Sequence, residues 1–303
     1  MFLFKNLFSF FNLGTGFICF QIGLLLLPSS AFLSGSFFLI ALVLGFLKRQ
    51  ESYWSDYWNY PLLVIGVLLC IGSIDAFSGW LAWIGLANWL PFFLCFWGFQ
   101  PYLLTIQMRK KSSLFLLVGT LPVLLTGLGQ MFLGWEGPWQ IFDGLIVWFV
   151  GPGGSPFGRL SGLFDYANIA GAWLAVVWPF CLAALCQPFL SKRNRILFLL
   201  ISIFLVVALF LTESRNAWGG LILSVPLVLG VSSWFWLLPL MLLFSLPIVF
   251  SVVPGIDVGL QEWARNITPD GIWMRLNDLK FIDSRPVEAT RIHQWKIAAD
   301  LIA

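Results

Sequence analysis

Long apolar runs, separated by short polar stretches, constrain this chain more than any other feature of its sequence. Of its 303 residues, 59% are hydrophobic and 10% are charged, and the mean hydropathy is +0.90. A soluble domain of this length could not bury so much apolar surface. Inside a bilayer every backbone group must pair within the protein, and apolar runs with little strict alternation do so as helices and not as a barrel. We therefore expect an all-α polytopic membrane protein.

Nine of these runs are predicted to be transmembrane helices, because about 20 apolar residues cross a bilayer. The predicted spans are 15–32, 33–47, 61–78, 80–99, 113–134, 163–187, 196–212, 217–233 and 234–253. They define a transmembrane helical domain over residues 1–253, and residues 254–303 are interpreted as the start of an extracytoplasmic helical domain. Residues 287–303 form an apolar helix face that nothing later in the chain covers, so this domain is expected to be truncated.

Short basic loops predict the orientation of the chain. Clusters at Lys48–Arg49, Arg109–Lys111 and Lys192–Arg195 are two predicted spans apart, so all three are expected on one side. The positive-inside rule makes that side the cytoplasm, and Lys5 places the N-terminus there as well. Nine spans then leave the C-terminal segment outside. The expected location is a bacterial cytoplasmic (inner) membrane.

Two polar stretches, residues 158–168 and 212–218, interrupt the apolar background on the predicted outer face. An arginine near the hydrocarbon boundary is costly unless it is paired or hydrated, so Arg159 and Arg215 are candidate functional residues. Simpler interpretations stay open. Glu213 and Arg215 could neutralise each other, or Arg215 could extend to lipid headgroups. Arg159 could be an ordinary exposed arginine of a Gly-rich loop.

Three short motifs follow one another on this expected outer face. They are RLSGLF at 159–164 followed by Asn168, TESRNAW at 212–218, and RIHQWKIAA at 291–299. In order and spacing they resemble the R-x-x-G-x-F, T-x-S-R-x-x-W/L and R-x-x-x-W-x-x-A motifs of the O-antigen ligase and polymerase superfamily. The resemblance covers roughly residues 60 to 303. Where that family has N-P-N, this chain has Asp165 to Asn168, so only Asn168 carries over.

The resemblance implies a polytopic membrane glycosyltransferase of the GT-C type. Such an enzyme transfers a glycan from a polyprenyl-diphosphate-linked donor to a lipid or glycan acceptor outside the membrane. Guanidinium groups can stabilise the leaving diphosphate without a metal or cofactor. The residues expected at the catalytic centre are Arg215, Arg291 and His293, and those expected to bind substrate are Arg159, Asn168, Asp165 and Trp218. Membrane lipids are expected partners, and nucleic acid is not.

Other interpretations of the same residues remain. In the family, the catalytic histidine follows a Gly-x-Gly stretch, and His293 lies before that position. Asp165 could be a solvated loop acid. Some members of the family are labelled inorganic-carbon transporters, so transport of a small solute is the alternative function. The predicted spans contain polar residues such as Gln130 but no acidic or basic residue at mid-membrane, which an ion pathway would need. A third alternative is an inactive fragment of the transferase.

Overall fold

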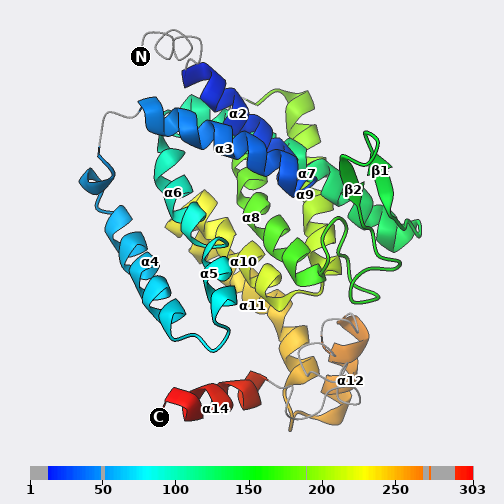
Figure 1. The fold of residues 1–303 in the computed structure, drawn as a ribbon. Helices are drawn as coiled ribbons and strands as arrows, with labels where there is room; N and C mark the ends of the chain where they lie inside the picture. The colour runs from blue at the N-terminus through cyan, green and yellow to red at the C-terminus, as the bar shows by residue number, and fades with distance from the viewer. Residues whose placement is uncertain (1–12, 49–51, 189, 269–272, 274–290, 303) are drawn as a thin grey trace, which may run out of the picture.

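The computed structural model describes residues 13–48, 52–188, 190–268, 273 and 291–302. It is mostly helical, which confirms the predicted fold class (Figure 1). The helices are α2 (Leu13–Leu26), α3 (Ala31–Lys48), α4 (Asn59–Ile74), α5 (Trp80–Leu86), α6 (Leu90–Gly98), α7 (Ile106–Phe132), α8 (Ala167–Leu185), α9 (Lys192–Leu211), α10 (Arg215–Leu229), α11 (Trp234–Val252), α12 (Val258–Ile267) and α14 (Arg291–Ile302). Strands β1 (Trp139–Ile141) and β2 (Ile146–Trp148) form an antiparallel hairpin.

The predicted count of nine spans is wrong for the residues that the structure describes. Four helical segments are long and apolar enough to cross a membrane: Trp80–Gly98, which joins α5 and α6, and then α7, α8 and α9. A fifth results only if α10 and the start of α11, which meet at a bend of 120°, are one span. These apolar helices indicate a membrane protein. They do not support the span count that placed residues 254–303 outside.

Helix length explains part of the difference between the predicted and the observed number of spans. α2 and α4 coincide with predicted spans, but they have 14 and 16 residues. At 1.5 Å per residue they measure about 21 and 24 Å, less than the roughly 30 Å of a bilayer's hydrocarbon core. The apolar runs were longer than the helices because they included turn residues such as Pro28 and Asp75. Lys5 and Arg49, which supported the predicted orientation, lie outside the described residues.

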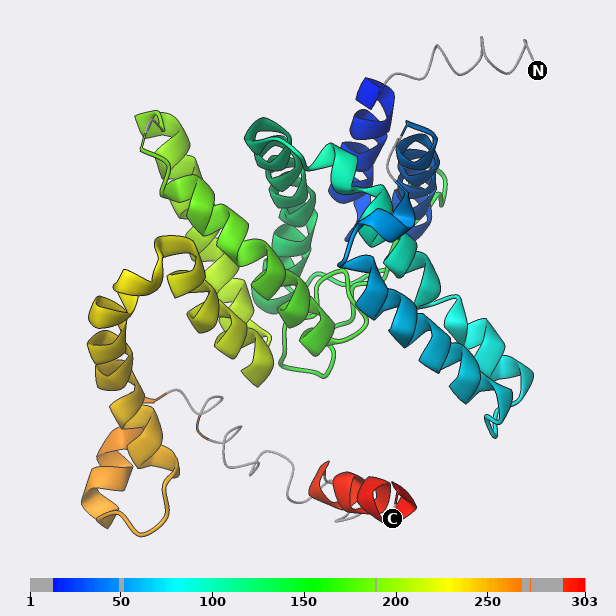
Figure 2. The ribbon, with the colours of Figure 1, turned by 90° about the vertical axis from the view of Figure 1, so that its left-hand side faces the viewer.

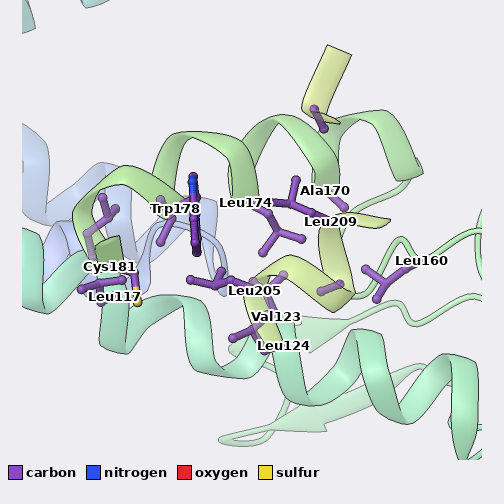
Figure 3. Close-up of a cluster of buried hydrophobic side chains, with 14 residues drawn as sticks. Leu117, Val123, Leu124, Leu160, Ala170, Leu174, Trp178, Cys181, Leu205 and Leu209 are labelled. Carbon is purple, nitrogen blue, oxygen red and sulfur yellow. The ribbon is translucent and has the colours of Figure 1, made fainter. Parts of the chain in front are cut away.

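The main hydrophobic core lies among α7, α8, α9 and α10 (Figure 3). Its buried members include Leu117, Val123 and Leu124 of α7, Leu174 and Trp178 of α8, and Leu205 and Leu209 of α9. Leu160, from the first motif, is fully buried in the same core. The motif is therefore attached to the end of the helix bundle and does not extend into solvent.

A smaller core joins α2 and α3 to the segment that follows α6. Tyr102, in the 3₁₀ helix Gln100–Tyr102, donates its hydroxyl hydrogen to the carbonyl of Ala41 at 2.7 Å. Its ring stacks on Phe20 with 5.5 Å between centroids. α2 also packs against α7. In the view of Figure 2, α4, α5 and α6 extend to one side of the bundle and α8 to α11 lie on the other.

Glycines lie at the closest helix crossings. A Cβ atom on Gly119 of α7 would meet the backbone carbonyl of Leu25 in α2. A Cβ on Gly171 of α8 would lie 3.0 Å from the Thr212 hydroxyl and from the Cβ of Ala217. Small residues allow helix backbones to approach closely in membranes, where apolar burial gives little drive for helix association. The contact at Gly171 brings the second motif against the start of α8.

Replacing Gly119 with alanine is expected to destabilise the protein. The substitution Gly119→Ala inserts a methyl group against the Leu25 backbone, and overpacking of this kind costs about 1–3 kcal/mol. The control is Gly72→Ala in α4, where an added Cβ meets nothing within 4 Å and the higher helix propensity of alanine is the main effect. Thermal unfolding of the detergent-solubilised protein should give a lower midpoint for Gly119→Ala only. Equal shifts in both variants would contradict the close α2–α7 crossing.

Candidate functional site

Four helix ends meet at one end of the bundle: the C-terminal ends of α7 and α9 and the N-terminal ends of α8 and α10. Hydrogen bonds link the ends of α7, α8 and α9 to the loop of residues 133–166, which carries the β1–β2 hairpin (Figure 1). The hairpin is also bound to the α2–α3 turn, because the indole N–H of Trp148 donates to the carbonyl of Ser29 at 3.0 Å. The loop is therefore held in place from several directions.

Gln130, in the last turn of α7, holds this loop by its side-chain amide. The side chain is 1% exposed. Its Nε2 donates to the carbonyl of Gly151 at 2.7 Å, and its Oε1 accepts from the backbone N–H groups of Ser161 and Gly162 at 3.1 and 2.9 Å. A buried amide that satisfies backbone groups from two parts of a loop fixes its conformation, because losing it would leave the N–H groups of Ser161 and Gly162 without their acceptor.

Arg159 lies at the centre of the site and is 1% exposed. Its Nε donates to the carbonyl of Thr212 at 2.8 Å, and Nη2 donates to Oδ1 of Asn168 at 2.7 Å. The guanidinium carbon lies 5.8 Å from the ring centroid of Tyr166. One side chain thus connects the first motif to the end of α9, the start of the second motif. The interpretation of Arg159 as an exposed loop residue is wrong.

The backbone around Arg159 strengthens this connection. The N–H of Leu160 donates to the carbonyl of Leu211 at 2.8 Å, and the N–H of Ala167 donates to the carbonyl of Ser155 at 2.7 Å. Gly154 has a φ of 96°, and a Cβ at this position would collide with the carbonyl of Arg159. Glycine is therefore required where the loop folds back over the arginine.

The electrostatic environment of Arg159 is formed by dipoles. Its described contacts are a carbonyl, an amide oxygen and an aromatic ring, and they include no carboxylate. Thr212 is the C-cap of α9, so the guanidinium lies at the negative end of that helix dipole, which favours a cation. Nη1 is buried and has no hydrogen-bond partner among the described residues. The site therefore holds a buried positive charge that dipoles and an aromatic ring stabilise.

The second motif forms the turn between α9 and α10. Glu213 adopts a φ of 48°, and the N–H of Ser214 donates to the Thr212 hydroxyl at 3.3 Å. Arg215 is the first residue of α10 and is exposed. Ser214, the N-cap, makes no side-chain capping hydrogen bond, so the first-turn N–H groups of α10 lack their usual side-chain acceptor. The indole N–H of Trp218 donates to the carbonyl of Leu209 at 3.3 Å, which ties α10 to α9.

A cavity of about 300 Å³ adjoins the loop. Its polar lining comes from Ser155, Ser161 and the exposed Asp165, and its apolar lining includes Phe149 and Phe164. Asp165 is two residues from α8 and three from Asn168, so a carboxylate and the Arg159–Asn168 pair lie in one short segment. Among the described residues no three His, Cys, Asp or Glu side chains are grouped so that they could hold a metal ion.

The third motif is not brought to this site in the structure. Arg291 and His293 lie on α14, which is separate from α7 to α10 in Figures 1 and 2. Their side chains are outside the described part of the chain, so their roles stay predictions. The structure thus brings together Arg159 and Asn168 with the turn that precedes Arg215 and Trp218 of α10, and Asp165 lines the adjoining cavity.

Comparison with protein-family models, curated proteins and solved structures gave no match. The family resemblance of this chain is therefore carried by its three motifs.

Sequence reasoning missed Gln130 as part of the site. It appeared as one of a few polar residues inside an apolar run, and its partners lie 21 to 32 residues later in the chain. Its position near the end of a predicted span, facing a Gly-rich loop, was the available signal. The β1–β2 hairpin was missed as well, because each strand has three residues.

Replacing Gln130 with leucine is expected to loosen the loop. Gln130→Leu leaves the N–H groups of Ser161 and Gly162 without the acceptor that holds them, at a cost of about 1–3 kcal/mol for each group, and it removes one of two hydrogen bonds to the carbonyl of Gly151. The control is Gln107→Leu, which makes the same change at an exposed residue of the same helix. Limited proteolysis in detergent should cleave residues 133–166 faster in Gln130→Leu only. An unchanged cleavage rate would show that the loop is held without this amide.

Proposed function

We propose that this chain acts as a membrane glycosyltransferase that moves a glycan from a polyprenyl-diphosphate carrier to a lipid or glycan acceptor outside the cytoplasmic membrane. One observation carries the proposal: the buried guanidinium group of Arg159 binds the carbonyl of Thr212, 53 residues later in the chain. Two motifs that resemble those of the O-antigen ligase and polymerase superfamily thereby form one cationic site. The motifs were identified from sequence alone, so their contact supports the resemblance independently.

The side of the membrane that the site faces is inferred from two single helices, α9 and α7, and not from the total number of spans. α9 begins at Lys192 within a basic cluster and ends at Leu211 next to Thr212. Its 20 residues span about 30 Å, the thickness of the hydrocarbon core. α7 repeats this arrangement, with Arg109 near its start and Gln130 near its end. The positive-inside rule places the basic ends in the cytoplasm, so the arginine site faces the outside.

Arg215 is the residue that we assign to the donor diphosphate. It is exposed, whereas Arg159 is covered. The first-turn N–H groups of α10 lie beside it, and helix N-termini favour phosphate groups. Arg159 is then a positioning residue that holds Asn168 and the Thr212 turn, and it adds a fixed positive charge behind the site. A bidentate guanidinium suits a diphosphate better than a lysine does.

The reaction requires charge stabilisation on the leaving group. The anomeric C–O bond to the diphosphate breaks, the polyprenyl diphosphate leaves with the electron pair, and an acceptor hydroxyl oxygen forms the new C–O bond. The acceptor proton passes to a general base, for which His293 is the predicted residue. In the cavity beside the site, Asp165 can accept a hydrogen bond from the acceptor hydroxyl and orient it. Preorganised positive groups stabilise the negative charge that develops during this step.

Replacing Arg215 with alanine is expected to abolish glycan transfer. The full-length gene, expressed in cells that lack the chromosomal copy, should restore the surface polysaccharide profile. Arg215→Ala should reduce the transferred glycan by about 10²-fold or more, because one group that stabilises the developing charge is lost. Gel profiles of surface glycan measure this effect, and an immunoblot of the membrane fraction verifies equal protein.

The matched control is Arg193→Ala, which removes an exposed arginine at the opposite end of α9 and should leave the glycan profile normal. Uptake of inorganic carbon is measured in the same cells. A normal glycan profile with lost uptake in Arg215→Ala would overturn the transferase and favour transport.

Thiol labelling tests the sidedness separately. In a cysteine-free variant, single cysteines are introduced by Phe157→Cys, in the exposed part of the loop, and by Arg193→Cys, at the start of α9. A membrane-impermeant maleimide should label position 157 in intact cells and position 193 only after permeabilisation. The reverse pattern would place the arginine site in the cytoplasm and contradict the proposed reaction.

A further inference from the structure

A second polar feature lies at the opposite end of the same helices. A cavity of about 650 Å³, open on one side, is lined by the start of α7, the end of α8 and the start of α9. Arg109 and Lys110 form its cationic rim, and Leu117, Phe180 and Phe198 are among its apolar walls. Arg109 at its rim lies 21 residues before Gln130 of the arginine site, which is about 30 Å along α7. The cavity therefore needs a function of its own.

Both main walls of the cavity change from polar to apolar in the same direction. On α7, Arg109, Ser113 and Leu117 are four residues apart, so they lie along one helix face over about 12 Å. On α8, which runs the opposite way, Gln187 lies beyond the helix end and Phe180 lies two turns earlier. The ammonium group of Lys110 donates to Oε1 of Gln187 at 3.4 Å, so the two polar ends meet at the rim. A molecule with one polar end and one apolar end would match this lining.

The charge of this end is not neutralised by the helices that form it. The sequence has no Asp or Glu between Asp75 and Glu136, or between Asp165 and Glu213, so α7, α8 and α9 contain no acidic residue. The basic residues of α7 and α9, in the clusters Arg109–Lys111 and Lys192–Arg195, lie at this same end of the helix bundle. A ligand that complements the cavity is negatively charged at the rim and apolar inside.

We propose that this cavity binds one anionic phospholipid, with the phosphate on Arg109 and Lys110 and an acyl chain along Leu117 and Phe180. Basic pockets between membrane helices on the cytoplasmic side suit anionic lipid headgroups, because the phosphate gains charged partners while its chain stays in an apolar environment. The lipid fills the space between the ends of α7, α8 and α9 and stabilises their packing. The inference is independent of glycan transfer.

Lipid binding to the purified full chain tests the proposal. The probes are dioleoyl phosphatidylglycerol, dioleoyl phosphatidylcholine with the same chains, and inorganic phosphate, each added to delipidated protein in detergent. Native mass spectrometry gives the affinity, and thermal unfolding gives the stabilisation. We expect tight binding and stabilisation by phosphatidylglycerol only. Arg109→Gln with Lys110→Gln should weaken that binding about 10- to 30-fold, because two favourable charge contacts are removed.

Two further variants separate the cavity from general surface charge. Ala184→Trp fills the apolar part of the cavity and leaves every charge in place, and it should also abolish tight lipid binding. The control, Lys111→Gln with Arg193→Gln, removes the same charge from the same end at residues that do not line the cavity, and it should leave the affinity unchanged. An equal loss in this control would overturn the proposal in favour of nonspecific attraction. Equal binding of phosphatidylcholine, or stabilisation by inorganic phosphate that Ala184→Trp does not affect, would overturn it as well.

Discussion

The contact between the Arg159 guanidinium and the α9 carbonyl terminus is the interaction on which the end of the bundle that carries the loop of residues 133–166 depends. Burying a cation is costly unless polar groups replace its water. Here the dipole of α9, the Asn168 amide and the Tyr166 ring do so without a carboxylate. Because the described contacts of Arg159 include no carboxylate, its positive charge is not neutralised by them and contributes to the field at this end of the bundle. A salt bridge at the same place would give stability but would weaken that field.

The positions of the helices could be predicted from sequence, because hydropathy is a local property of each run. The number of spans could not be predicted, because it depends on where each helix ends. Pro28 and Asp75 end the first and third runs before they are long enough to cross. The Trp80–Gly98 segment shows the opposite case, since its short break between α5 and α6 still leaves a length that can cross.

The residues of the site were easier to predict than their environment. Arg159 and Arg215 were identified because charge is rare in this chain, but the burial of Arg159 was not predicted. A Gly-rich loop is typically exposed, so composition suggested that Arg159 faces solvent. Its burial depends on Gln130 and Leu160, which attach the loop to α7 and to the core, and such contacts between distant segments have no local signature. Arg215, held between two helices, is the exposed residue.

The bend at Gly230 affects the side of the membrane on which the next helix of the chain lies. α10 starts at the arginine site, and in Figure 2 α11 turns back toward the end at which α10 began. A hairpin that dips into the bilayer and emerges again leaves the chain on the face that it entered, as two complete crossings would. With such a hairpin, α12 begins on the side of the membrane from which α10 starts at Arg215. A straightened α10–α11 pair would carry α12 to the opposite side.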